Sequence, residues 1–159
     1  TDSGREKFEH SYDDLAVAAL KFMSAQSGEH LVKAFAQSRA DDIERKATIA
    51  LAKRSNKSEA LATFLTEQGY ATSVESRPLG EQLCQHHCPI AHVAAEFPQL
   101  CEAETEAFSK ILGTHVQRLA TIAHGDGVCT TYIPNLSRVT TKTRITQTTR
   151  TITAGKATK

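Results

Sequence analysis

Tryptophan is absent from this chain of 159 residues, which has one Met, four Pro and three Tyr. No apolar run approaches the roughly 20 residues that cross a bilayer, so we expect no membrane partner. The N-terminal stretch is polar and lacks the apolar core of a secretion signal, which favours a cytoplasmic location. Apolar residues make up 40% and charged residues 23%, which excludes wholly disordered, collagen-like and disulfide-dense proteins.

Acidic residues are missing from residues 135–159, which hold six Lys/Arg and nine Thr. We predict a basic, Thr-rich disordered tail there, because few large apolar side chains are present to bury. Residues 1–134 then hold 13 Lys/Arg against 18 Asp/Glu, a net charge of −5. By charge alone, this folded part is a poor nucleic-acid binder.

Apolar residues at helical spacing predict that residues 1–68 form a helical region. The expected helices run from about Ser11 to Gly28, from about Glu29 to Arg54, and over 58–68. The second helix is long for a globular protein, which favours packing against a partner subunit. We therefore expect a homodimer through this region, with residues such as Phe35 and Ile43 in the interface.

Residues 69–134 alternate strand and helix patterns. Two strands are expected near 70–75 and 81–85, and two more near 115–122 and 128–133. Two helices separate the pairs of strands, one starting at Pro89 and one over 100–112. The fold class is therefore α+β, a helical region followed by a small four-stranded antiparallel sheet with two helices, then the tail over 135–159.

The four cysteines gather in one stretch with the pattern C-x3-C-x12-C-x27-C, at Cys84, Cys88, Cys101 and Cys129. Buried apolar thiols and a disulfide are two alternatives, but a disulfide fits poorly with a chain without a secretion signal. Metal binding is favoured, because two of the cysteines lie near predicted helix starts, where thiolates are stabilised.

The spacing also bears on which metal is bound. Structural zinc usually takes two close cysteine pairs, whereas this chain has one loose pair and two single cysteines. Widely spread thiolates suit an iron–sulfur cluster, with zinc as the alternative cofactor. A Cys–His hydrolase with Cys129 as nucleophile and His115 or His124 as base lacks an orienting third group, so we expect no enzyme and no small-molecule substrate.

The run GEQLCQHHCPIAHVAAEFPQLCEAETEAFSKILGTHVQRLATIAHGDGVCTTYIP, residues 80–134, resembles the C-terminal part of SufR-type transcriptional regulators, above all the actinobacterial members. Residues 4–22 also resemble their middle region. This resemblance implies a homodimeric repressor of iron–sulfur cluster assembly (suf) genes, whose sensor domain binds a [4Fe–4S] cluster and responds to redox or iron status. Operator DNA would be contacted only through an N-terminal winged helix-turn-helix domain, which these residues lack.

The family pattern C-x12-C-x13-C-x14-C matches Cys88, Cys101 and, one residue short, Cys129. Its third cysteine position holds His115 here. The fourth ligand implied by the resemblance is therefore Cys84, His115 or an external molecule. We expect Cys84, because a thiolate neutralises cluster charge better than a neutral imidazole.

Overall fold

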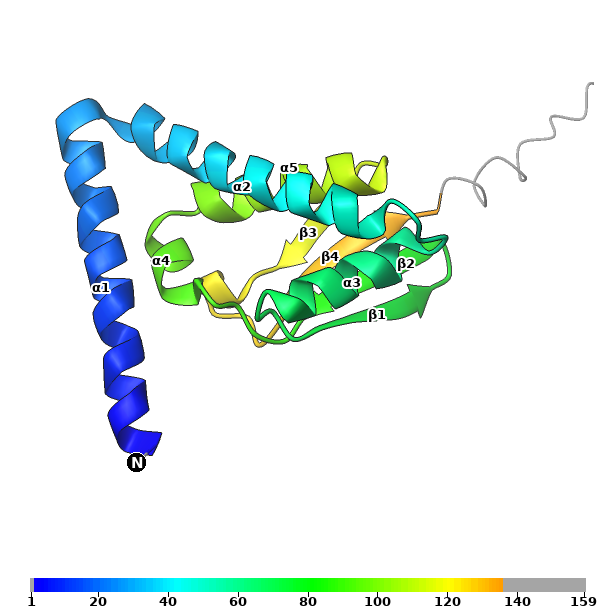
Figure 1. Cartoon of the computed structure of the whole chain (residues 1–159), viewed down its shortest axis with the longest axis horizontal. Coiled ribbons are helices and arrows are strands. Elements are labelled where there is room, and N and C mark those ends of the chain that lie inside the picture. Colours follow the sequence, from blue (N-terminus) through cyan, green and yellow to red (C-terminus); the bar gives the residue numbers. More distant parts are fainter. Residues whose placement is uncertain (1, 136–159) are drawn as a thin grey trace, which may run out of the picture.

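The computed structural model describes residues 2–135, with side chains described from Tyr12 onward. The fold is α+β, with helices first and then a four-stranded antiparallel sheet interspersed with helices (Figure 1). The helices are α1 (Asp2–Ser27), α2 (Glu29–Leu51), α3 (Lys57–Glu67), α4 (Ala91–Glu96) and α5 (Gln99–Leu112), with a short 3₁₀ turn η1 (Ile122–His124). The strands are β1 (Thr72–Arg77), β2 (Gly80–Gln85), β3 (Gln117–Ala120) and β4 (Cys129–Pro134).

The sheet has the strand order β1-β2-β4-β3, and every neighbouring pair is antiparallel. The hairpin β1–β2 closes over residues 77–80, and Gly80 is required there because an added Cβ would lie 2.2 Å from the Ile133 carbonyl oxygen. Strand β4 lies in the middle, with Gln85 of β2 directly opposite Cys129. This register decides which side chains share a face of the sheet.

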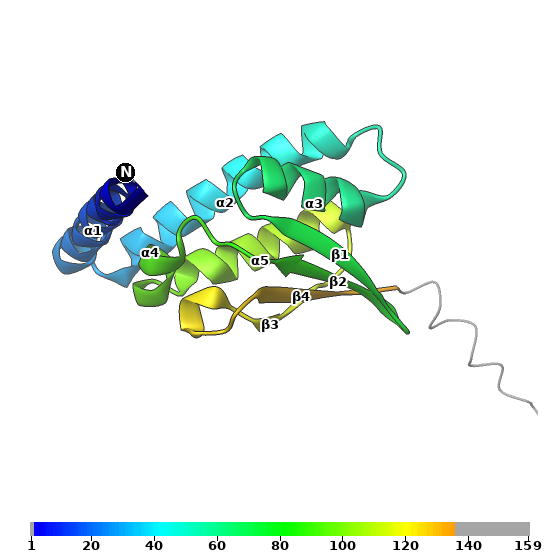
Figure 2. The ribbon, with the colours of Figure 1, turned by 90° about the horizontal axis from the view of Figure 1, so that it is seen from below.

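Helices α2, α3 and α5 cover one face of the sheet, which we call the inner face (Figure 2). The described part of the chain places no helix over the opposite, outer face. Helix α1 stands at one end of the molecule, where it packs against α2 and α4 (Figure 1).

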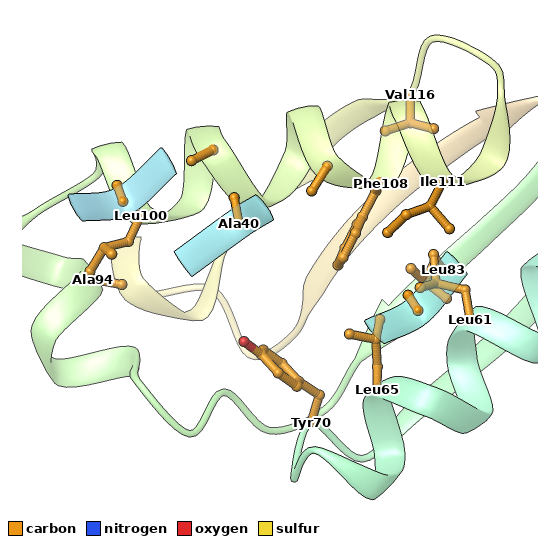
Figure 3. Packing of buried hydrophobic residues seen from close by; sticks show 14 of the residues in the cluster. Ala40, Leu61, Leu65, Tyr70, Leu83, Ala94, Leu100, Phe108, Ile111 and Val116 are labelled. Atoms are coloured by element: carbon orange, nitrogen blue, oxygen red, sulfur yellow. The ribbon is translucent and has the colours of Figure 1, made fainter. Parts of the chain in front are cut away.

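The hydrophobic core lies between the inner face and these helices (Figure 3). Phe108 of α5 and Leu83 of β2 are both fully buried there. Helix α2 faces α5 with small residues, Ala36, Ala40 and Ala47, which allow close approach of the two helices. One hydrophobic cluster runs from α1 through α2 to β4, so the helices and the sheet share a core.

Several element ends differ from the sequence-based prediction. Helix α1 begins at Asp2 rather than near Ser11, because Arg, Glu and Lys favour helix there without an apolar pattern to mark it. Helix α2 ends at Leu51 and α4 begins at Ala91. Strand β3 is shorter than predicted, since a register shift between Arg118 and Ala120 breaks its pairing before η1.

Other boundaries are as predicted. Helix α5 ends at Gly113, which takes the left-handed conformation expected of a glycine C-cap. The predicted tail lies almost wholly outside the described residues, which end at Asn135. In the described part of the chain, no helix is long and apolar enough to cross a membrane.

Candidate metal centre

Cys88 and Cys101 come from a loop and from the start of helix α5, respectively. Cys88 lies between β2 and α4, and Cys101 lies in the first turn of α5, just after the helix-starting Pro98. Both thiols are partly buried, and the backbone N–H of Ile90 points its positive end at the Cys88 thiol. An N–H directed at sulfur favours the thiolate form.

Cys129 begins β4 and is only 3% exposed. Its Sγ accepts a hydrogen bond of 3.2 Å from the backbone N–H of Ile122. The turn that carries Ile122 is fixed by Asp126, whose carboxylate accepts a 2.8 Å hydrogen bond from the Thr121 N–H. The local backbone therefore presents a donor to this sulfur.

These three thiols lie close enough to act on one another electrostatically. Charge on Cys129 or Cys101 disfavours a thiolate at Cys88, and charge on Cys129 disfavours one at Cys101. The three cysteines come from the β2–α4 loop, α5 and β4, elements far apart in the sequence. The three residues that match the SufR-type pattern therefore lie within electrostatic range of one another, although the four cysteines do not form a cluster.

Both partly buried thiols have raised pKa values. Burial, and then mainly the nearby carboxylate of Glu104, raises the pKa of Cys101 to about 11. Burial also raises the pKa of Cys88 to about 11, and the Ile90 N–H only partly opposes this. Without a metal, these thiols are protonated at neutral pH, so metal binding must release protons.

A buried ion pair lies beside the thiols. Arg118 of β3 donates from Nη2 to Glu104 Oε2 of α5 across 2.9 Å, and the two side chains are 12% and 11% exposed. The guanidinium also donates to Gln85 Oε1 at 2.9 Å and to Thr105 Oγ1 at 3.3 Å. Breaking such a buried pair by removing one partner typically costs about 3–5 kcal/mol.

Arg118 and Glu104 were not among the site residues predicted from the sequence. The sequence did contain an indication, because Arg118 falls on the same side of its strand as the apolar residues Val116 and Ala120. Glu104 likewise falls on the buried face of α5, next to Ala103. A charged residue among the buried apolar positions of a helix or strand indicates a side chain that is buried and paired with an opposite charge.

Cys84 lies away from the other three cysteines. On β2 it lies opposite Ser73 of β1 and Thr130 of β4. The next residue of β2, Gln85, lies opposite Cys129, and both of these side chains point to the inner face. Its side chain therefore points to the outer face. The charges that act on it, Glu75 and Arg77, belong to that face as well, and burial is the main cause that raises its pKa. This placement argues against the choice of Cys84 as fourth ligand.

His115 is exposed and follows the far end of α5. From Cys101 to Leu112 the helix rises about 16 Å, and His115 lines the same cavity as Cys101. Among the other histidines of the cysteine region, His87 contacts the Gly69 carbonyl oxygen at 2.7 Å and His92 lies 3.5 Å from Asp14. Neither interaction involves a cysteine.

The described residues contain no group of three or more His, Cys, Asp or Glu side chains placed to hold a single metal ion, and the four cysteines form no common cluster. A tetrahedral zinc site needs four donors about 2.0–2.3 Å from one point. The zinc alternative thus has no preformed site in this part of the chain. A cluster bound by all four cysteines likewise has no preformed site there.

Three buried polar atoms without hydrogen-bond partners lie on segments next to Cys129. Gln85 Nε2, Thr121 Oγ1 and Thr131 Oγ1 are buried and make no hydrogen bond. Gln85 lies opposite Cys129, Thr131 follows it by two residues on the same face, and Thr121 precedes Ile122. Such donors cost about 1–3 kcal/mol each when left unpaired, and the sulfur atoms of a cluster are acceptors. The donor set therefore fits an iron–sulfur group.

A cavity of about 700 Å³ opens between α5 and β3. Its lining includes Cys101, Arg118, Thr121 and His124. The cavity connects the surface with the Cys101 side of the site, so a small molecule or water can reach it.

Comparison with known proteins returned no matching family model, no matching curated protein and no matching solved structure.

Proposed function

We propose that this chain is the iron–sulfur sensor and dimerisation part of a transcriptional repressor of the SufR type. The observation that carries the proposal is that Cys88, Cys101 and Cys129, from three separate elements, lie within electrostatic range of one another, with the buried cation Arg118 in range of Cys101 and Cys129. The unpaired donors around Cys129 support it, because they suit an acceptor-rich group.

In this proposal Cys88, Cys101 and Cys129 would hold a [4Fe–4S] cluster, and a ligand from outside these three residues would complete it. The cavity at Cys101 is open to the surface. When bound, the cluster supplies sensitivity to oxidants and to iron supply. The residues of the chain would hold and tune it: the Ile122 N–H donates to Cys129 Sγ, and burial of Cys129 shields that sulfur from water.

The homodimer is also a proposal, and the structure suggests a different contact surface for it. Ile43 of α2 packs against the core of its own chain, whereas Phe35, the other residue predicted in the interface, is 44% exposed. Helix α1 instead carries an exposed apolar stripe at Tyr12, Leu15 and Phe22, which are 77%, 67% and 66% exposed. Their spacing of three and seven residues is that of a helix–helix seam, so we propose α1 as the dimer contact.

Operator DNA, in this proposal, is bound by a winged helix-turn-helix domain that residues 1–159 do not include. Cluster loss would then loosen the contacts between α5 and α2 and change the geometry of α1, which packs on α2. The chain itself acts as the sensor and performs no catalysis.

Visible absorption of anaerobically purified protein tests the proposal. A cluster gives a brown protein with a broad band near about 400 nm that fades on exposure to air. A colourless protein that contains zinc would support the alternative of a zinc-stabilised structural domain.

A further inference from the structure

The cavity between α5 and β3 is a groove along the edge strand of the sheet (Figure 2). One wall is a single face of α5, because the lining residues recur at helical spacing from Pro98 to Lys110. The other wall is the strand, since all but one of residues 115–121 line the groove. Neighbouring residues of a strand point to opposite faces, so such a run lines one groove only where the backbone edge of the strand faces it.

Strand β3 has a neighbouring strand on one side only within the described part of the chain, since the strand order is β1-β2-β4-β3. Such an edge leaves backbone N–H and C=O groups available to a further strand. A groove between an edge strand and a helix therefore suits an extended segment, which adds to the sheet through main-chain hydrogen bonds. From Val116 to Ala120 the chain rises about 13 Å, the span of about four or five extended residues.

The charges of the groove favour a basic segment. Glu102 and Glu106, one turn apart on α5, are exposed, and neither forms an ion pair with another described residue. Asp126 adds a third carboxylate to the lining. The two cations of the lining, Lys110 and Arg118, already pair with carboxylates of α2 and α5, at 3.4 and 2.9 Å. The lining therefore carries an excess of negative charge, which attracts a positively charged ligand.

The groove also contains a buried polar atom without a partner. Thr121 lines it and is 7% exposed, and its Oγ1 makes no hydrogen bond within the described residues. A hydroxyl can accept a hydrogen bond as well as donate one. A backbone N–H of an added strand can therefore supply an acceptor's missing partner here.

Residues 136–159 of this chain have the chemistry that the groove requires. They hold six Lys/Arg and no Asp/Glu. Val, Ile and Thr, which favour strands, make up most of residues 139–153. The composition that predicts a disordered tail for this segment on its own also suits a strand that forms on binding.

The described part of the chain ends near the start of β3, within reach of the groove. Tyr132 of β4 lies opposite Gln117, the first residue of β3. Asn135, three residues later, lines one small cavity together with Thr114. The outer edge of β3 is about two strand spacings from β4, or about 10 Å, which three or four extended residues span. Residues from about 139 onward can therefore enter the groove at its His115 end.

We propose that residues 139–146 bind in this groove as a further strand beside β3. Entering at the start of β3, the segment runs parallel to β3 and antiparallel to α5. Lys142 and Arg144 then share one side of the strand, about 7 Å apart, and Glu106 and Glu102 lie about 6 Å apart along the helix. Lys142 therefore faces Glu106, and Arg144 faces Glu102. This inference involves no metal and does not depend on the proposed function.

Hydrogen exchange of the full chain, followed by mass spectrometry, tests the proposal. Relative to the intrinsic rates of their sequences, residues 139–146 should exchange more slowly than residues 154–159. Glu102→Lys/Glu106→Lys should speed exchange of residues 139–146 by about tenfold or more, because two attractive contacts become repulsive. Glu102→Gln/Glu106→Gln removes the charges without reversing them, so it should act in the same direction and less strongly.

Glu59→Lys/Glu67→Lys is the matched control, because it makes the same change of charge at two exposed carboxylates of α3. It should leave exchange of residues 139–146 unchanged, and exchange in α2 should be the same in all variants. Equal relative rates for residues 139–146 and 154–159 in the wild type overturn the proposal, as does slow exchange that survives Glu102→Lys/Glu106→Lys. Slow exchange that is lost on dilution would assign the added strand to a second copy and overturn binding within one chain.

Discussion

Cys84 of β2 and Cys129 of β4 lie on adjacent strands, one residue out of register, and their side chains point to opposite faces of the sheet. Gln85, not Cys84, is the residue directly opposite Cys129. Because successive residues of a strand point to opposite faces, this shift of one residue places Cys129 at the candidate centre and Cys84 outside it.

Because Cys84 and Cys129 point to opposite faces of the sheet, we expect only the other three cysteines to act as ligands. Cys88→Ser, Cys101→Ser and Cys129→Ser should each lose the absorption band near about 400 nm, because a serine hydroxyl is a poor ligand for the cluster iron. Cys84→Ser should keep the band and its iron content. Spectra of the four variants after anaerobic reconstitution provide the measurement. Loss of the band in Cys84→Ser alone would show that we have assigned the wrong thiols.

Sequence alone could predict the order of elements, because helix and strand periods, Pro98 and Gly113 mark them clearly. It could not predict to which face of the sheet the Cys84 side chain points. Leu83, Cys84 and Gln85 are all buried, so β2 lacks the alternation of apolar and polar residues that fixes strand phase. The burial of Glu104 and Arg118 depends on their pairing across the fold, which a local pattern does not contain.

The raised thiol pKa values predict a pH dependence of the metal-free protein. The folded pKa of Cys88 and of Cys101 is about 11, against an ordinary value of 9.0. A raised folded pKa means that the unfolded chain releases these protons first as pH rises. Stability should therefore hold below about pH 9 and decline between about pH 9 and 11, by on the order of a few kcal/mol.

Urea denaturation of the metal-free chain at several pH values measures this decline. Cys88→Ser/Cys101→Ser is the control, and it should lose most of the pH dependence in that window. An equally steep decline in the double variant would assign the effect to other groups.

The exposed stripe of α1 predicts how the dimer can be split. Leu15→Asp or Phe22→Asp should yield monomers, because a carboxylate would be buried without a partner in the seam. Ile49→Asp is the matched control, since Ile49 is 74% exposed on α2 and lies outside this stripe. Light scattering at micromolar concentration gives the masses. A monomeric wild type would rule out the dimer, and dissociation by Ile49→Asp alone would move the contact to α2.

Loss of the centre should loosen the chain along the path from α5 to α2. Hydrogen exchange should rise in the loop of Cys88, in the first turns of α5 and in β4, and also in the part of α2 that packs on α5. Exchange in β1, at the far edge of the sheet, should change little. A rise confined to the cysteine loops would mean that the site does not communicate with the N-terminal helices.

The central claim is that Cys88, Cys101 and Cys129 hold an iron–sulfur cluster, and the iron and acid-labile sulfide content of the anaerobically purified wild-type chain tests it most directly. The account predicts iron and sulfide in equal amounts, bound together and lost together on exposure to air. Zinc without sulfide, or no bound metal after anaerobic reconstitution with iron and sulfide, would contradict it.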